Sequence, residues 1–343
     1  METKQLKILV TGATGFLGKR LAERLIEEGY PVRALARRRS NVGALKTLGV
    51  EIAFGDLGDG LSIAAAVNDM DVVVHAAAGT SGTTKDSDTA TIQGTRNVLE
   101  ACKAGRVKKL VYISSCSVYE VAGYTENQVV TEEAQLERFP LRRGHYSAAK
   151  LQAEALVTAA MNHDGFLAVV LRPGTIYGPG AEVYTNMMGV SLARRIFVVF
   201  GDGKSELPLV HVDNAVDAIV ACITSSASDN QVFNVVDRDL VSKRTYVERV
   251  VKPLYPNAIV TYVPMSLLLT LTWLQEKLLA TLGRQPSLTV YRLVSSQKRI
   301  RYSTSKIEQA IGWRPHIGFE QGVKHLMRER GRAPDIGERR IVP

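Results

Sequence analysis

Short apolar runs alternate with amphipathic segments through the first half of the chain. The amphipathic segments, such as 62–68 and 95–102, repeat their apolar residues at helical spacing. Near-continuous runs of Val, Ile and Leu separated by helices are typical of a parallel sheet that is covered on both faces. The sequence therefore predicts an α/β fold with a doubly wound parallel sheet. The strand-like runs span residues 8–10, 32–36, 50–56, 71–75, 110–115 and 167–172.

After residue 180 this rhythm changes. The run 232–236 is predicted to return to the sheet, and the remainder is less regular. Residues 264–282 carry leucines at helical spacing, and three polar residues at 275–277 interrupt them. Three interpretations of this helix stay open: it covers an apolar pocket or core, it touches a membrane surface through residues 265–282, or it binds a partner protein.

The composition is that of an ordinary globular protein of 343 residues, 45% hydrophobic and 22% charged, without a run long enough to span a bilayer. The net charge of +9 favours anionic partners, and part of it gathers at 37–39 and 324–343. No zinc-finger or RNA-binding aromatic motif accompanies these clusters, so we expect a solvated basic surface and no nucleic-acid partner. The chain has three cysteines, none of them in a C-x-x-C pair, and its polar N-terminal residues show no signal-peptide pattern. These features predict a reducing, cytoplasmic location.

The first apolar run leads into glycines at positions 12, 15 and 18. Gly12 would allow the tight turn, Gly15 would let the backbone approach a pyrophosphate, and Gly18 would let the following helix pack closely. A strand before the glycines and an amphipathic helix after them are the context that a dinucleotide-binding turn requires. The segment that would hold the pyrophosphate also contains Thr14, Phe16 and Leu17.

The second predicted strand ends at Ala36, where dinucleotide folds usually carry an acid for the ribose hydroxyls. Arg37 and Arg38 follow it. A small residue followed by arginines admits a 2′-phosphate and pairs with it, so the sequence favours NADP, with NAD as the alternative. Asp56, after the third strand, would suit the adenine amino group or serve as a plain turn residue.

Tyr146 and Lys150 are four residues apart and share one face of a predicted helix. A carbonyl that receives a hydride needs a proton, and a neighbouring ammonium together with a positive nicotinamide would lower the pKa of a tyrosine for this task. Residues 114–117 place hydroxyls after the fifth strand, where open parallel sheets bind ligands. Such a hydroxyl would bind the substrate oxygen, or it would cap the next segment.

Together these segments resemble an extended short-chain dehydrogenase/reductase of the NAD-dependent epimerase/dehydratase superfamily. The resemblance implies a Rossmann domain of residues 1–180 and 211–237, with a smaller discontinuous substrate-binding region of residues 181–210 and 238–343. It rests on the segments 11–18, 55–57, 75–78, 94–101, 114–119, 146–150, 171–180, 211–213 and 311–315.

The same resemblance assigns roles to individual residues. The catalytic set falls on Ser115, Tyr146 and Lys150, with Ser117 as the reserve hydroxyl. A small-molecule substrate is implied, and a homodimer is compatible with the family. No metal site is expected. The predicted cofactor contacts are Gly12, Thr14, Gly15, Phe16, Leu17, Arg37, Arg38, Asp56, Leu57, Ala76, Ala77, Tyr146, Lys150 and Pro173.

The chain also departs from the family pattern. Cys116 and Ser117 stand where sugar dehydratases carry an Asp-Glu pair, so no acid/base pair is available for eliminating water. Thr91 replaces a frequent Asn, which puts the family's water relay in doubt. We expect His75 to line the nicotinamide side of the strand end or to pack there, and Asp213 to be a helix N-cap.

The C-terminal third, including 285–290 and 302–306, is loosely similar to 3β-hydroxysteroid/sterol dehydrogenase-like members. The predicted function is therefore an NADP-dependent oxidoreductase that interconverts a ketone and a secondary alcohol on a largely apolar, sterol-like or β-keto substrate. Two alternatives remain. One is a nucleotide-sugar epimerase, with Arg194, Arg195 and Lys204 as candidate diphosphate ligands; the other is a non-catalytic NADP-binding regulator.

Overall fold

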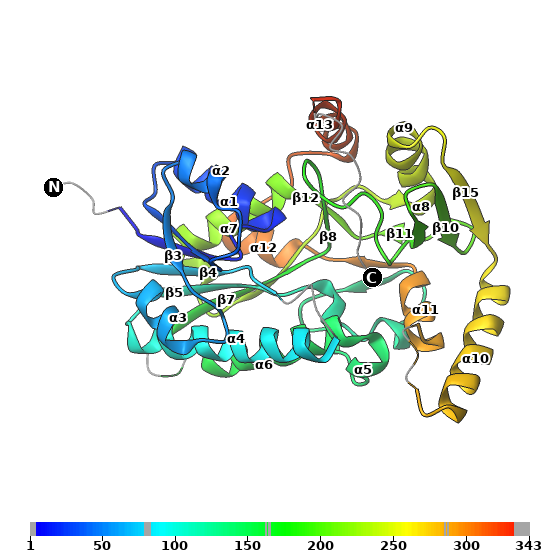
Figure 1. The fold of residues 1–343 in the computed structure, drawn as a ribbon, viewed down its shortest axis with the longest axis horizontal. Coiled ribbons are helices and arrows are strands. Elements are labelled where there is room, and N and C mark those ends of the chain that lie inside the picture. The colour runs from blue at the N-terminus through cyan, green and yellow to red at the C-terminus, as the bar shows by residue number, and fades with distance from the viewer. Residues whose placement is uncertain are drawn as a thin grey trace.

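The computed structural model describes residues 5–78, 84–161, 163, 166–284, 286 and 288–332, with the side chains of 84–90 and 332 left out. The end of the basic 324–343 cluster and residues 285 and 287 lie outside the described residues. A seven-stranded parallel sheet forms the centre, in the order β13-β7-β5-β4-β1-β2-β3 (Figure 1). Its strands are β1 Ile8–Thr11, β2 Val32–Ala36, β3 Glu51–Phe54, β4 Val72–His75, β5 Lys109–Ile113, β7 Leu167–Pro173 and β13 Val232–Val235. The predicted doubly wound sheet is confirmed, including the return of the 232–236 run to its edge.

Successive side chains along each strand point to opposite faces of the sheet, so the core forms two layers. Ile8 and Val10 of β1 point to one face, where they share a cluster with Leu21 of α1, while Leu9 points to the other face with Ile63 of α3. Figure 1 shows α1, α7 and α12 on one side of the sheet and α3, α4 and α6 on the other. The helices of the two layers, together with the short α2, are α1 Phe16–Glu27, α2 Gly43–Thr47, α3 Gly60–Val67, α4 Thr84–Ala104, α6 His145–Ala160, α7 Val212–Thr224 and α12 Ser305–Ile311.

The remaining elements gather beyond the carboxyl ends of the central strands (Figure 1). A three-stranded sheet β15-β10-β9 forms the largest unit there, and short pairs join β8 to β12, β11 to β14 and β6 to β16. The strands are β6 Gln128–Val130, β8 Thr175–Tyr177, β9 Gly189–Leu192, β10 Ile196–Phe200, β11 Glu206–Leu207, β12 Leu209–His211, β14 Val241–Ser242, β15 Ile259–Val263 and β16 Ile300–Tyr302. The helices are α5 Pro140–Arg143, α8 Lys243–Tyr246, α9 Lys252–Leu254, α10 Met265–Thr281, α11 Val290–Gln297 and α13 Phe319–Arg332.

The predicted division into two regions stays a prediction. Residues assigned to the substrate-binding region come back to the central sheet, because Ile307 of α12 and Trp313 are buried in the same cluster as β1. The indole of Trp313 donates to the carbonyl of Asn214 on α7 at 3.1 Å. The C-terminal third therefore helps to cover the large sheet.

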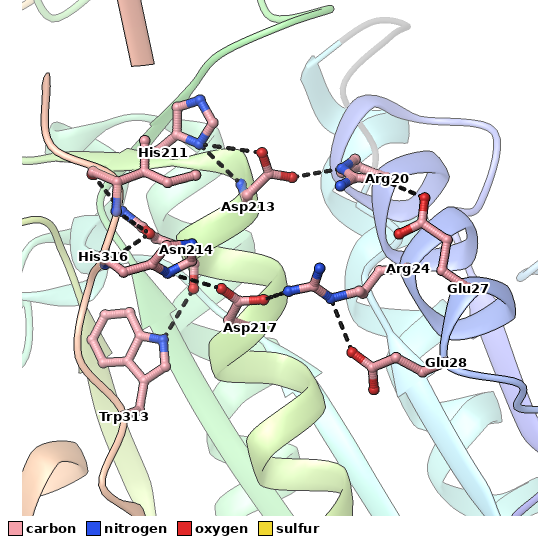
Figure 2. Close-up of polar contacts among 11 residues, drawn as sticks. Arg20, Arg24, Glu27, Glu28, His211, Asp213, Asn214, Asp217, Trp313 and His316 are labelled. Carbon is pink, nitrogen blue, oxygen red and sulfur yellow. Dashed lines mark hydrogen bonds and ion pairs between the residues drawn. The ribbon is translucent and has the colours of Figure 1, made fainter. Parts of the chain in front are cut away.

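Ion pairs fasten α1 to α7 beside this contact (Figure 2). Nε of Arg20 lies 2.5 Å from Oδ1 of Asp213, and Arg24 pairs with Asp217. The expectation that Asp213 caps α7 is wrong. Nδ1 of His211 accepts from the Asp213 N–H at 3.2 Å, so His211 is the N-cap, and the Asp213 carboxylate in the first turn is used by Arg20 instead.

The helix predicted over 264–282 forms as α10, but its leucine stripe does not pack on a core. Leu267, Leu271, Leu274, Leu278 and Leu282 are each exposed by 50% or more, and Thr272 is the fully buried residue of the helix. The interpretation of this stripe as core is therefore wrong. No helix in the described ranges is both long and apolar enough to cross a membrane.

Candidate active site at the carboxyl ends of the strands

The glycine turn after β1 is built by close backbone approach. Gly12 has φ +76, and a Cβ on it would lie 2.8 Å from the amide nitrogen of Ala77. A Cβ on Gly18 would lie 2.2 Å from the carbonyl oxygen of Gly12. The turn is thus pressed between the segment after β4, which holds Ala76 and Ala77, and the start of α1. Only residues without side chains fit at these two positions.

The start of α1 is open to a ligand. Gly15 is the N-cap residue and offers no side-chain cap, so the first N–H groups of the helix have no partner within it. Gly15 and Thr14 are exposed. Phe16 contacts the Gly180 position and Leu17 packs on the core, so these two would meet a pyrophosphate through their backbone N–H groups. Backbone donors at a helix N-terminus form an anion site, and the turn therefore fits a dinucleotide.

The ends of β2 and β3 lie next to each other in the sheet, where the adenosine half would bind. Ala36 is buried, while Arg37 and Arg38 are exposed and pair with no carboxylate in the described part of the chain. Asp56 acts as a turn residue, because its Oδ1 accepts from the Gly58 N–H at 2.9 Å. Its contact with adenine stays a prediction.

The loop that carries Leu57 is held by α4. Nδ2 of Asn97 donates to the Leu57 carbonyl at 2.7 Å, and a Cβ on Gly94 would come within 2.9 Å of Leu57. Neither α4 residue had a role predicted for it from the sequence. Their signal was their place in the 94–101 segment that carries the family resemblance.

The predicted catalytic residues come together where β5 ends and α6 begins. Tyr146 lies in the first turn of α6 and shares a side-chain hydrogen bond with Ser115, which directly follows Ser114 at the end of β5. Lys150 is 3% exposed, and its Nζ donates to the Ile113 carbonyl at 2.6 Å. Tyr146 is 47% exposed, so the phenol is both hydrogen-bonded within the site and open to a ligand.

Burial shapes the pKa values of this group. Desolvation raises the pKa of Tyr146, although nearly half of the residue is exposed, and the hydrogen bond from Ser115 opposes the rise. Burial lowers the pKa of Lys150 to about 8, and the carboxylate of Glu154 opposes that change. The pKa of Tyr146 was expected to be lowered, but in the protein without cofactor it is raised. The expected lowering also depended on the positive charge of a nicotinamide, which only the cofactor supplies.

A buried polar network behind Lys150 was missed from the sequence. Glu154 follows Lys150 by one turn on α6 and accepts a hydrogen bond from the Ser114 hydroxyl. The Arg172 guanidinium on β7 binds the same carboxylate, with Nη2 at 2.5 Å and Nε at 3.1 Å from Oε1. Glu154 is 2% exposed and Arg172 4%. The regular spacing of Tyr146, Lys150 and Glu154 was the available signal.

Ser115 fills the capping role, one of the two that were left open, and its role toward a substrate oxygen stays a prediction. Its Oγ accepts from the Ser117 N–H at 3.1 Å and so caps the short 3₁₀ helix Cys116–Val118. The Ser117 hydroxyl is buried, and Cys116 is buried with its Sγ directed at the Arg172 carbonyl. Ser115 is thus the hydroxyl that meets Tyr146, and no carboxylate stands beside it in the chain segment 115–118.

His75 is a structural residue. Thr95 donates its one hydroxyl hydrogen to the Thr91 carbonyl at 2.8 Å, so it must accept from Nε2 of His75 at 3.1 Å. Nδ1 of His75 then accepts from Thr11 at 2.7 Å. Burial, assisted by the charge of Lys150, lowers the pKa of His75 to about 3. The ring is neutral at physiological pH and is buried at the strand end. This agrees with the expectation that His75 packs there.

Three groups with metal-binding atoms lie close together outside this site. His211, Asp213 and His325 place one such atom each within 4.8 Å of one another. The Asp213 carboxylate already binds Arg20, which competes with a cation for that oxygen. Arg194 and Arg195 lie in the turn between β9 and β10 and are exposed.

A protein-family model matches most of the chain. The model of the NAD dependent epimerase/dehydratase family matches residues 8–235, which contain the glycine turn and the Ser115–Tyr146–Lys150 set. The chain belongs to this family. The suspected extended short-chain dehydrogenase/reductase is confirmed, and the protein is an NAD(P)-dependent dehydrogenase/reductase of that type.

Individual relatives match nearly the whole chain. A 2-alkyl-3-oxoalkanoate reductase from Stenotrophomonas maltophilia is 29% identical over 330 residues, 94% of this chain and 98% of that protein. A 3β-hydroxysteroid-dehydrogenase/decarboxylase from Arabidopsis thaliana is 26% identical and covers 93% of this chain and 78% of its own length. The crystal structure of a UDP-glucuronic acid 4-epimerase from Bacillus cereus, in complex with UDP-glucuronic acid and NAD, has a TM-score of 0.71 at 20% identity, with 94% and 98% of the two chains covered. The last likeness establishes the fold alone.

Proposed function

We propose that this protein interconverts a ketone and a secondary alcohol on a largely apolar substrate and uses NADP. The observation that carries the proposal is the assembled Ser115–Tyr146–Lys150 group at the same carboxyl edge of the sheet as the open glycine turn. A reductase of 2-alkyl-3-oxoalkanoates and a 3β-hydroxysteroid dehydrogenase/decarboxylase among the relatives support an apolar ketone or alcohol as substrate.

The chain's own residues supply the proton chemistry. Tyr146 donates its proton to the substrate oxygen in the reduction and takes it back in the oxidation. Its phenol is neutral at physiological pH, as an ordinary tyrosine is, and desolvation raises its pKa further. Ser115 donates a hydrogen bond to the same oxygen, and this bond strengthens as negative charge develops there. Lys150, which follows Tyr146 by one helical turn on α6 and whose Nζ donates to the Ile113 carbonyl, would stabilise the phenolate that remains. The nicotinamide, when bound, supplies or accepts the hydride.

Substitution of Tyr146 tests this mechanism. Tyr146→Phe removes the proton donor, so we expect turnover with a ketone substrate to fall by roughly 10²- to 10⁴-fold. Binding of NADPH, followed by its fluorescence, should change little because the ring remains. Tyr30→Phe, at a tyrosine remote from the site, is the control and should retain wild-type turnover. A Tyr146→Phe enzyme with wild-type rates would show that another group moves the proton.

The preference for NADP rests on Arg37 and Arg38. A charge-assisted hydrogen bond to a 2′-phosphate contributes about 1.5–3 kcal/mol, which is roughly tenfold or more in affinity. Arg37→Glu should therefore raise the KM for NADPH at least that much and leave the KM for NADH nearly unchanged. Arg39→Glu, two residues further along the same loop, controls for the general loss of positive charge. Equal losses for both cofactors would exclude a contact between Arg37 and the 2′-phosphate.

The alternatives remain testable. A nucleotide-sugar epimerase would bind UDP- or GDP-sugars in calorimetry and would consume no NADPH over many turnovers. A non-catalytic regulator would bind NADPH but reduce none of a panel of β-keto esters and ketosteroids. We further propose a cytoplasmic location, which the three free, buried cysteines support. A homodimer, which the family permits, stays a prediction that sedimentation would test.

A further inference from the structure

Helix α10 is apolar on the side that faces solvent as well as on the side that packs. Its packed side contains Met265, Leu268, Thr272 and Leu279, which are half-buried or buried. Its opposite side carries the leucine stripe. Figure 1 shows the helix at one end of the molecule, away from the central sheet and beside α11. A helix with two apolar sides normally has a partner on both, so the stripe is a surface that something else covers. The stripe consists of Leu267, Leu271, Leu274, Leu278 and Leu282.

The charges around this stripe are positive. Lys277 and Arg284 are exposed on α10 and directly after it. The acidic residue of the helix, Glu276, is turned to α11, where its Oε1 accepts from the Val290 N–H at 3.1 Å. Trp273 is 52% exposed and lies to one side of the stripe together with Lys277, whose Nζ is 5.9 Å from its ring centroid. Leucines flanked by Trp and cations are the pattern of a helix that lies in a membrane interface.

The size of the surface favours lipid over a second copy of the chain. The five leucines and Trp273 together expose on the order of 500 Å² of apolar surface, large for a patch on a monomer but below the roughly 800 Å² that each partner contributes to a standard protein interface. The net charge of the chain, +9, adds attraction to anionic lipid. At about 1.5 Å per residue the helix is about 25 Å long and carries charge, so it suits the plane of a membrane rather than its thickness.

We propose that α10 lies in the surface of an anionic lipid membrane, with its leucine stripe at the acyl-chain boundary and Trp273 at the level of the headgroups. The position bears on the apolar substrate proposed above, and in that respect the inference rests on the proposed function. One element, α11, joins α10 to the catalytic residues. Thr289 before it binds the Arg142 carbonyl of α5 at 2.9 Å, and Arg292 lies about 3.6 Å from the Cβ position of Gly144, two residues before Tyr146. An apolar substrate dissolved in the bilayer would reach the site beside this helix.

The test uses the full chain with its NADPH bound and vesicles of phosphatidylcholine, with or without phosphatidylglycerol. Trp273 and Trp313 are the two tryptophans of the chain, and Trp313 is 5% exposed, so changes in emission on vesicle binding report on Trp273. We expect the protein to float with the phosphatidylglycerol vesicles, its emission to shift to shorter wavelength, and brominated lipid to quench it. Lys277→Glu should weaken the binding by roughly tenfold or more.

The double variant L271E/L278E should lose flotation entirely and keep the wild-type thermal midpoint, because both side chains are exposed. Leu240→Glu, at an equally exposed leucine before β14, should float like the wild type. Three results would overturn the proposal: no vesicle binding by the wild type, unchanged binding by L271E/L278E, or a dimer in sedimentation that L271E/L278E dissociates while vesicles bind neither protein. Flotation requires no substrate, so a failure of the proposed reaction, seen as no turnover of any ketone, would be recorded separately.

Discussion

Replacement of Glu154 by Gln tests the buried network on which Lys150 depends. The carboxylate is 2% exposed and is held by the Arg172 guanidinium at 2.5 Å and by the Ser114 hydroxyl. Removal of one partner of a buried ion pair costs about 3–5 kcal/mol, because the other charge stays buried without compensation. Gln can still accept from Ser114 but turns an N–H₂ group towards Arg172, so we expect the free energy of unfolding to fall by about 3 kcal/mol.

Denaturant unfolding followed by circular dichroism measures this loss. Glu133→Gln is the matched control, because Glu133 pairs with Lys306 at 3.6 Å on the surface, and an exposed pair contributes about 0–1 kcal/mol. The combined variant E154Q/R172M should lose less than the sum of the two single variants, since the two side chains act on each other. A loss below about 1 kcal/mol for Glu154→Gln would refute the idea that a buried charge pair stabilises this part of the sheet.

We expect the same variant to change the pH dependence of catalysis. The negative charge of Glu154 raises the pKa of Lys150 against burial, which brings it to about 8. Without that charge Lys150 should lose its proton at lower pH, so the alkaline limb of kcat/KM should move to lower pH in Glu154→Gln. A limb at an unchanged pH would show that Glu154 holds the helix only and does not act through Lys150.

Two further predictions concern stability. Gly18→Ala places a Cβ 2.2 Å from the Gly12 carbonyl oxygen, so it should lower the free energy of unfolding by about 2 kcal/mol or more and weaken NADPH binding. Gly60→Ala is the control, because the space around Gly60 is open, and it should change the free energy of unfolding by no more than about 1 kcal/mol. Equal effects of the two substitutions would contradict the close packing of the turn. Burial lowers the pKa of Lys243 to about 7, so between that pH and about 10 the unfolded chain binds the proton that the folded chain has lost. The unfolding free energy of the wild type should therefore rise with pH across this window relative to Lys243→Met, and a constant difference between the two proteins would refute the shift.

The central sheet and the residues that meet at its carboxyl edge could be predicted from local sequence patterns. Apolar runs and glycine spacing suffice for this, because strand period, turn geometry and helix starts are local properties that neighbouring residues fix. The helical spacing of Tyr146 and Lys150 likewise placed both side chains on one face before any packing was known.

The contacts of these residues could not be predicted, because they depend on how distant segments pack together. Arg172, distant in sequence from Glu154 on α6, could be paired with it only once β7 lay beside β5. The Asp213 carboxylate looked like a cap until α1 brought Arg20 to it. The stripe on α10 has the spacing of a core helix, but its leucines are exposed while other residues of the helix, such as Thr272 and Glu276, face the protein. Periodicity shows that a helix has an apolar face, but what lies against that face depends on residues far away in the chain.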